Sequence, residues 1–187
     1  ACLRLPVVRC LGAGRIVLSV GQQQPYKAQD QLIRALPELD PDVELVLPGA
    51  PTGFGDSLRR LAADLGVAER VHLLGFTAEA DLEALYAAAT CVAQPSRMEG
   101  FGLPALEAMV RGVPLACSGA TALAEVVGDA ALLFDPGDTT TVTTALRALL
   151  ADPALRERLA AQGRVQAARF TWRATADATV AAYHRTL

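Results

Sequence analysis

The sequence has few aromatic residues, no excess of positive charge and no long apolar run. Aromatic residues make up 5% of the 187 residues and the net charge is −3, so a basic surface for nucleic acid is not indicated. No apolar stretch reaches the roughly 20 residues that a membrane-spanning helix requires. Hydrophobic residues nevertheless make up 52% of the chain, which is enough for one sizeable domain with a substantial core.

The cysteines lack the spacing of a metal or redox site. No two of them form a C-x-x-C pair, and they stand at Cys2, Cys10, Cys91 and Cys117. Cys91 and Cys117 lie in apolar runs, where cysteine behaves as a small hydrophobic residue. Thiols of this kind are typical of a reducing compartment, so we expect a cytoplasmic protein without a structural metal.

Several catalytic motifs are also absent. The sequence contains no G-x-S-x-G elbow, no G-x-x-x-x-G-K-[ST] loop and no G-x-G-x-x-G directly after a predicted strand. The D-x-D pattern at 40–42 precedes a predicted strand, and we interpret it as a Pro-Asp turn rather than a metal site. His72 and His184 have no acid or nucleophile near them in the sequence, and we interpret both as non-catalytic.

Short apolar runs alternate with helical patterns along the chain. Buried strands are predicted at 15–20, 43–49, 70–75, 91–96, 113–119 and 130–136. Helices are predicted at 27–39, 56–66, 78–89, 103–112 and 121–128, and from residue 139 to the end with breaks at 152–153 and 170–172. This alternation predicts an α/β fold, namely a doubly wound, Rossmann-like parallel sheet of about six strands with helices on both faces and C-terminal helices appended. We expect a lead-in segment at 1–14, the Rossmann-like domain at 15–170 and a C-terminal helix at 171–187.

The segment SRMEGFGLPALEAM, at 96–109, places two glutamates around a run of small and apolar residues. Pro104 suits the first turn of a helix, so the amides just before it point outward at a helix N-terminus, which favours phosphate. These amides belong to Gly100, Phe101, Gly102 and Leu103. Glu99 and Glu107 would then flank the phosphate and accept hydrogen bonds from hydroxyl groups on either side of it, as in a nucleotide-sugar. The alternative is structural: Glu107 complements the helix dipole and Glu99 is a solvated loop residue.

Two further loops follow strands at the same edge of the predicted sheet. Lys27 begins the helix after the first strand, where a cation is unfavourable unless an anion is bound, and Gly21 permits the turn off that strand. Phosphate binding by Lys27 is favoured over the alternative of a solvated surface lysine. Gly75 and Phe76 follow the third strand and could bring backbone atoms or a ring against a base. An ordinary glycine turn with Phe76 in the core is an equal alternative.

The residues around the two glutamates resemble a known family. The segment SRMEGFGLPALEAMVRGVPLACS looks like the signature of retaining glycosyltransferases of the group 1, or family 4, type, including mannosyltransferase-like members. Their mark is the pattern E-x7-E, here formed by Glu99 and Glu107. The likeness continues in VGQQQPYKAQDQLIRAL, RVHLLGFTAEADLEALYAAA and ALAEVVGDAALLFDPGD, and it covers the chain from Arg15 to Tyr183.

This resemblance implies a GT-B enzyme with two Rossmann-like lobes, of which the chain looks like the C-terminal, donor-binding one. In such enzymes the first glutamate lies at the transferred sugar, and the second binds the ribose hydroxyls. The amides hold the pyrophosphate, the lysine stabilises the departing phosphate, and the third strand's loop meets the base. Carried over to this sequence, these residues are Glu99, Glu107, the amides of Gly100, Phe101, Gly102 and Leu103, Lys27, Gly75 and Phe76.

The same resemblance implies a nucleoside-diphosphate sugar as donor and no metal or cofactor, because a lysine and helix-terminal amides meet the developing charge. The acceptor, whether glycan, lipid or small molecule, is expected to bind mainly to an N-terminal lobe missing from this chain, and peripheral membrane contact would also go through that lobe. Gln22 stands where many members carry arginine directly after Gly21, so one phosphate contact is weaker or lost. The lobe alone is therefore expected to bind donor weakly and to transfer little or nothing.

The residues leave two other classes of function open. A non-catalytic nucleotide-sugar-binding or regulatory module would carry the same loops, and Gln22 favours it. A flavodoxin-like interaction domain would keep the glycines for structural reasons only. A nucleotide titration separates the interaction domain from the two nucleotide-binding hypotheses, and a transfer assay separates the enzyme from the binding module.

Overall fold

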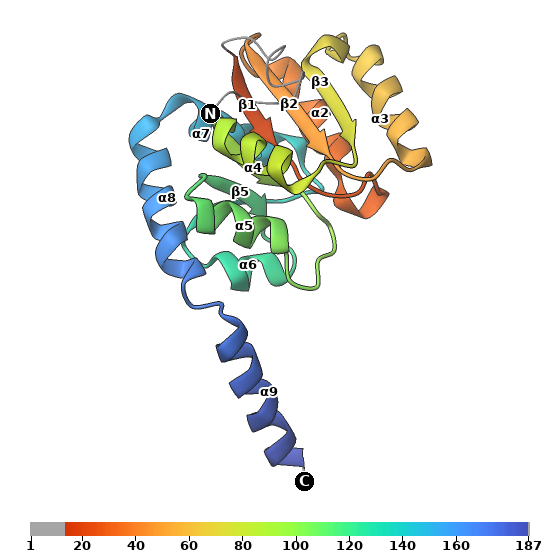
Figure 1. Cartoon of the computed structure of the whole chain (residues 1–187). Helices are drawn as coiled ribbons and strands as arrows, with labels where there is room; N and C mark the ends of the chain where they lie inside the picture. Colours follow the sequence, from red (N-terminus) through yellow and green to blue (C-terminus); the bar gives the residue numbers. More distant parts are fainter. Residues whose placement is uncertain (1–13, 187) are drawn as a thin grey trace.

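The computed structural model describes residues 14–186, which form an open sheet between two layers of helices (Figure 1). Of the lead-in segment predicted at 1–14, only Gly14 is among the described residues, and Cys2 and Cys10 lie outside them. The sheet has six strands: β1 (Arg15–Leu18), β2 (Val43–Pro48), β3 (Val71–Gly75), β4 (Cys91–Gln94), β5 (Leu115–Ser118) and β6 (Ala131–Phe134).

The strands are all parallel and lie in the order β3-β2-β1-β4-β5-β6. This order confirms the predicted doubly wound, Rossmann-like sheet. Val17 of β1 lies opposite Leu45 of β2 on one side and Cys91 of β4 on the other. The strand order therefore reverses between β1 and β4, and open sheets of this kind bind ligands beyond the carboxyl ends of the strands at such a switch point.

The helices cover both faces of the sheet. One face carries α2 (Gln29–Ala35), α3 (Gly53–Asp64) and α7 (Thr139–Ala151). The other face carries α4 (Glu79–Ala88), α5 (Leu103–Arg111) and α6 (Ala122–Val127). Short 3-10 turns stand at Pro25–Lys27, Leu36–Glu38 and Ala68–Arg70. Each predicted strand and helix is thus present, with its ends displaced by a few residues.

The last two helices complete the chain. α8 (Pro153–Ala167) runs beside the sheet and contacts α5 and α7, whereas α9 (Trp172–Thr186) projects away from the rest of the molecule in Figure 1. Thr171 caps α9, because its hydroxyl oxygen accepts a hydrogen bond from the Ala174 N–H. In the part of the chain that the structure describes, no helix is both long and apolar enough to cross a membrane.

Side chains of the strands alternate between two buried clusters. Val17 packs with α2, α3 and α7, whereas Ile16 and Leu18 pack with α4, α5 and α6. Neighbouring residues of a strand point to opposite faces, so a sheet covered on both faces needs apolar residues throughout. This requirement explains why the strands appear in the sequence as short continuous apolar runs.

Cys91 in β4 and Cys117 in β5 are free thiols with no exposed surface. Burial raises the pKa of each thiol to about 12, so the reactive thiolate is essentially absent at neutral pH. We expect iodoacetamide at pH 8 to leave both residues unmodified in the folded chain and to alkylate them in guanidinium chloride, as peptide mass spectrometry would show. Modification of either residue before unfolding would contradict this placement.

Candidate functional site

The loop after β1 brings a cation to the carboxyl edge of the sheet. The Gly21 N–H donates to the Pro48 carbonyl over 3.0 Å, and a methyl group on Gly21 would lie 3.6 Å from Cε of Lys27. The Lys27 side chain therefore extends across Gly21. Lys27 ends the turn Pro25–Lys27, and α2 begins two residues later, after Ala28 with a φ of 50°. The prediction that Lys27 begins the helix is wrong, because Ala28, in the left-handed conformation, separates Lys27 from the start of α2.

The loop after β4 leaves open backbone amides at the N-terminus of α5. Gly102 caps this helix with a φ of 94°, and any Cβ there would overlap Leu123, so the position requires glycine. Pro104 is the second residue of the helix, which confirms its place in the first turn. No described residue accepts a hydrogen bond from the N–H groups of Gly100, Phe101, Gly102 and Leu103. These donors and the positive end of the helix are chemically suited to an anion.

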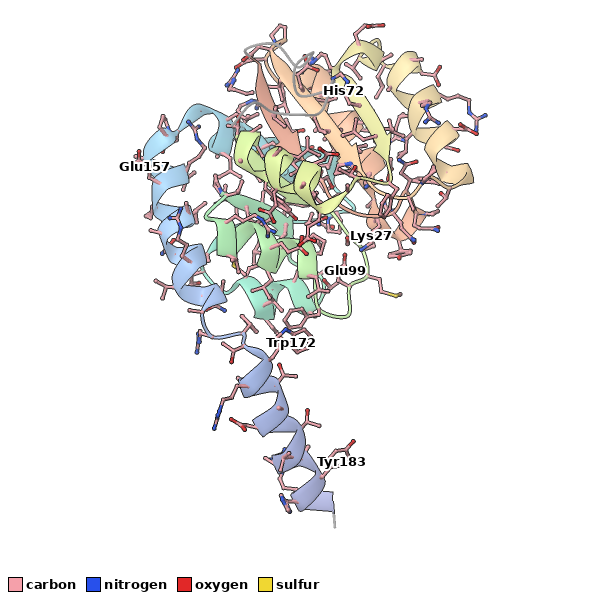
Figure 2. The ribbon with its side chains drawn as sticks, in the orientation of Figure 1. Lys27, His72, Glu99, Glu157, Trp172 and Tyr183 are labelled. Carbon is pink, nitrogen blue, oxygen red and sulfur yellow. The ribbon has the colours of Figure 1, made fainter. Side chains whose placement is uncertain are left out.

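Lys27 and Glu99 meet between these two loops (Figure 2). Lys27 Nζ lies 2.5 Å from Glu99 Oε1, and the Ser96 hydroxyl donates to the same oxygen over 2.8 Å. The side chains of Lys27 and Glu99 are only 14% and 12% exposed, so the alternatives of a solvated lysine and a solvated glutamate are wrong. A backbone hydrogen bond of 2.7 Å from Arg97 to Tyr26 joins the same two loops.

Glu107 is held from the neighbouring helix α4. It is the fifth residue of α5, beyond the first turn, so the alternative that it only complements the helix dipole is disfavoured. The Tyr86 hydroxyl donates to Glu107 Oε2 over 2.9 Å. Burial raises the pKa of Tyr86 above its usual value, with the Glu107 charge adding to the effect. Tyr86 was not predicted from the sequence, because its contact with Glu107 depends on how α4 packs beside α5.

The residues predicted to meet a base and a phosphate lie at the same edge of the sheet. Gly75 ends β3 with a φ of 73°, and its carbonyl accepts a hydrogen bond from the Gly49 N–H over 2.8 Å. Phe76 follows it and is 84% exposed, so the alternative that places this ring in the core is wrong. Gln22 is also exposed, directly after Gly21 in the loop from β1. Both side chains are therefore accessible to a ligand.

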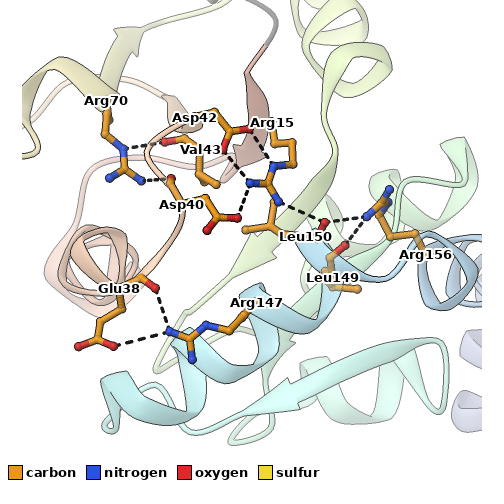
Figure 3. A network of polar contacts seen from close by, with 10 residues as sticks. All are labelled: Arg15, Glu38, Asp40, Asp42, Val43, Arg70, Arg147, Leu149, Leu150 and Arg156. Atoms are coloured by element: carbon orange, nitrogen blue, oxygen red, sulfur yellow. Dashed lines mark hydrogen bonds and ion pairs between the residues drawn. The ribbon is translucent and has the colours of Figure 1, made fainter.

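A separate polar network occupies the opposite, amino edge of the sheet (Figure 3). Arg15 at the start of β1 forms ion pairs with Asp40 at 2.6 Å and Asp42 at 2.7 Å, and this contact holds the pKa of Asp42 below its usual range. The D-x-D pattern is thus the turn that the sequence predicts. His72 pairs with Glu44 on the adjacent strand at 2.7 Å. Within residues 14–186, no three potential metal ligands of the His, Cys, Asp and Glu types come together.

The fold defines a doubly wound α/β domain, and the residues on the loops after β1 and β4 lie at its switch point, where open sheets of this kind bind ligands. A cation, a carboxylate and open amides all stand on the loops that follow β1 and β4. The family model for glycosyl transferases group 1 matches residues 12–166, which is most of the chain, so the protein belongs to the group 1 glycosyltransferase family. This membership confirms the resemblance drawn from the segment around Glu99 and Glu107.

Relatives and solved structures agree with this family. O-antigen chain mannosyltransferase B of Escherichia coli is 37% identical over 170 residues, which are 89% of this chain and 45% of that protein. D-inositol 3-phosphate glycosyltransferase of Mycolicibacterium gilvum is 40% identical over 182 residues, 94% of this chain and 40% of that protein. The chain thus spans less than half the length of either relative. The structure of Anabaena HepE with UDP and glucose matches with a TM-score of 0.86 at 26% identity, over 99% of this chain and 52% of that one.

Proposed function

We propose that this chain is the donor-binding lobe of a retaining, metal-independent glycosyltransferase that moves a hexose, such as mannose, from a nucleoside-diphosphate sugar to an acceptor. The observation that carries the proposal is the meeting of Lys27 and Glu99 beside the open amides of α5. It combines donors for a diphosphate with an acceptor for sugar hydroxyls. The mannosyltransferase relative and the HepE complex with UDP and glucose support the same chemistry.

Transfer breaks the bond between the anomeric carbon and the terminal phosphate oxygen of the donor. The electron pair of that bond stays with the diphosphate, so negative charge grows there, within reach of Lys27 and of the amides at 100–103. The acceptor hydroxyl oxygen bonds to the anomeric carbon on the face that the phosphate leaves, and the hydroxyl proton departs with the diphosphate. Stabilising charge that develops only during bond breaking is what accelerates such a step.

The ion pair between Lys27 and Glu99 is compatible with this division of roles. An ammonium group has three N–H donors, of which Glu99 Oε1 engages one. The remaining donors can reach phosphate oxygens while Glu99 keeps the lysine oriented. Glu99 Oε2 stays available for a sugar hydroxyl, because Lys27 and Ser96 both bind to Oε1.

The other parts of the donor are assigned to the remaining loops. Glu107 would bind the ribose hydroxyls, and the backbone near Gly75 with the exposed Phe76 would meet the base. Gln22 would reach a phosphate only as a neutral hydrogen-bond donor. An N-terminal lobe would supply the acceptor site and any peripheral membrane contact.

Calorimetric titration of this chain with UDP, GDP and ADP tests the donor site. We expect saturable binding of at least one nucleoside diphosphate and much weaker binding of the matching nucleoside, because the diphosphate provides the charge that Lys27 and the α5 amides meet. The substitution Glu157→Gln, on α8 far from the site in Figure 2, serves as a control and should leave the affinity unchanged. The absence of binding by all three nucleotides would overturn the proposal.

A second candidate is a nucleotide-sugar-binding module without chemistry, which the neutral Gln22 favours. Such a module would give the same nucleotide affinities in the titration. It would release no nucleoside diphosphate from the sugar donor when the acceptor lobe and an acceptor are present. Measured transfer in the two-lobed enzyme would exclude it.

A further inference from the structure

We propose that Tyr86 is a positioning residue for ribose recognition, an inference that rests on the proposed function. Its hydroxyl lies 2.9 Å from Glu107 Oε2 and 3.3 Å from the Pro104 carbonyl, and its side chain is 1% exposed. The shorter contact is a charge-assisted hydrogen bond, which is stronger than one to a carbonyl. Tyr86 thus fixes one carboxylate oxygen of Glu107 and leaves Oε1 to accept from the ribose hydroxyls.

Among the described residues, the Glu107 carboxylate forms no ion pair, although Arg111 lies one helical turn away. Arg111 could pair with Glu107 at this spacing, but it binds the carboxylate of Glu83 and donates only to the backbone carbonyl of Glu107, over 3.0 Å. No other described cation forms an ion pair with Glu107. The carboxylate is therefore oriented by a neutral phenol at Oε2, and Oε1 keeps its capacity to accept hydrogen bonds.

The phenol itself is held on two sides. The Arg111 guanidinium lies over the Tyr86 ring, 4.6 Å from its centroid, and the ring belongs to the buried cluster beneath α4, α5 and α6. Arg111 in turn is fixed by Glu83 on α4, one helical turn before Tyr86. The Tyr86 hydroxyl therefore has little freedom to leave Glu107, and a freely rotating carboxylate would bind the ribose less selectively.

The test compares each nucleoside diphosphate with its 2′,3′-dideoxy counterpart, using UDP, GDP and ADP. We expect the wild-type chain to prefer the ribose form of the nucleotide that it binds by about tenfold or more, and Tyr86→Phe to reduce this preference by about three- to tenfold. Affinity for the dideoxy form should change by less than about twofold, because Tyr86→Phe keeps the ring and its contact with Arg111. The double variant Tyr86→Phe/Glu107→Gln should match Glu107→Gln alone in its ribose preference.

Tyr183→Phe is the matched control, since it removes a hydroxyl from an exposed tyrosine on α9. A melting curve establishes that each variant is folded. If Tyr86→Phe weakens both forms of the nucleotide equally, or leaves the ribose preference unchanged, Tyr86 has only a structural role and the inference is wrong. Binding of none of the nucleotides by the wild-type chain would instead overturn the proposed function, and this inference with it.

Discussion

When Lys27 is replaced by methionine, the affinity of the chain for a nucleoside diphosphate should fall by about 10- to 100-fold. The reason is that a charge-assisted hydrogen bond to a phosphate contributes about 1.5–3 kcal/mol, and methionine keeps the unbranched stem of the side chain without its charged amine. Turnover of the sugar donor by the two-lobed enzyme should fall further, by about a hundredfold or more, because charge on the phosphate grows as the bond breaks. Calorimetry and nucleotide release measure the two effects.

The same substitution should weaken the ligand-free fold. It leaves Glu99, which is 12% exposed, without its cation, and an unpaired group at this depth costs about 1–3 kcal/mol of the free energy of unfolding. The matched control is Arg34→Met on α2, which removes a more exposed cation, 48% exposed, from a weak pairing at 3.7 Å. Equal nucleotide affinity in the Lys27→Met variant and the wild type would contradict phosphate binding by Lys27.

Replacing Glu99 with glutamine should have the opposite effect on nucleotide affinity and a large effect on turnover. Without the carboxylate, Lys27 is no longer held by an anion, and repulsion between Glu99 and a phosphate disappears. We therefore expect nucleoside diphosphate affinity to stay unchanged or to rise by up to about tenfold. Donor turnover should fall by about a hundred- to ten-thousandfold, since Glu99 would no longer present a charged acceptor at the sugar.

The two substitutions are expected to change nucleoside diphosphate affinity in opposite directions. This difference distinguishes a donor site that contains both residues from an ion pair that only stabilises the loops. If Lys27 and Glu99 only stabilised the loops, both substitutions would lower melting temperature and affinity together. Glu157→Gln provides the matched loss of one carboxylate and should change neither quantity. Full donor turnover by the Glu99→Gln enzyme would remove Glu99 from the proposed chemistry.

The fold could be predicted because its signal is local and repeated. Each strand is a short apolar run, and each helix has apolar residues at helical spacing. Both patterns can be recognised in the sequence without knowledge of tertiary contacts. The ends of helices and strands are predicted less accurately. The helix α3, for example, is predicted to begin at Asp56 but begins at Gly53. Thr52 caps this helix through a hydrogen bond from the Phe54 N–H, a contact that the apolar pattern does not contain.

The site was predictable as a set of residues but not as a set of contacts. The lysine and the first glutamate are 72 residues apart, and their meeting depends on β1 and β4 being neighbours across the switch point. The contact between Tyr86 and Glu107 likewise depends on how α4 packs beside α5. Such pairings arise from strand order and helix packing, and the spacing of residues along the chain does not indicate them.

The hydrogen bond from the Arg97 N–H to the Tyr26 carbonyl bears on the entropy of ligand binding. Two separate loops would each lose conformational freedom when a ligand bridges them, at a cost of about 1 kcal/mol or more per residue ordered. Here a main-chain hydrogen bond already joins the two loops. A ligand that contacts one loop therefore finds the other loop already in place. Because this bond uses only backbone atoms, the preorganisation does not depend on the side chains at these two positions.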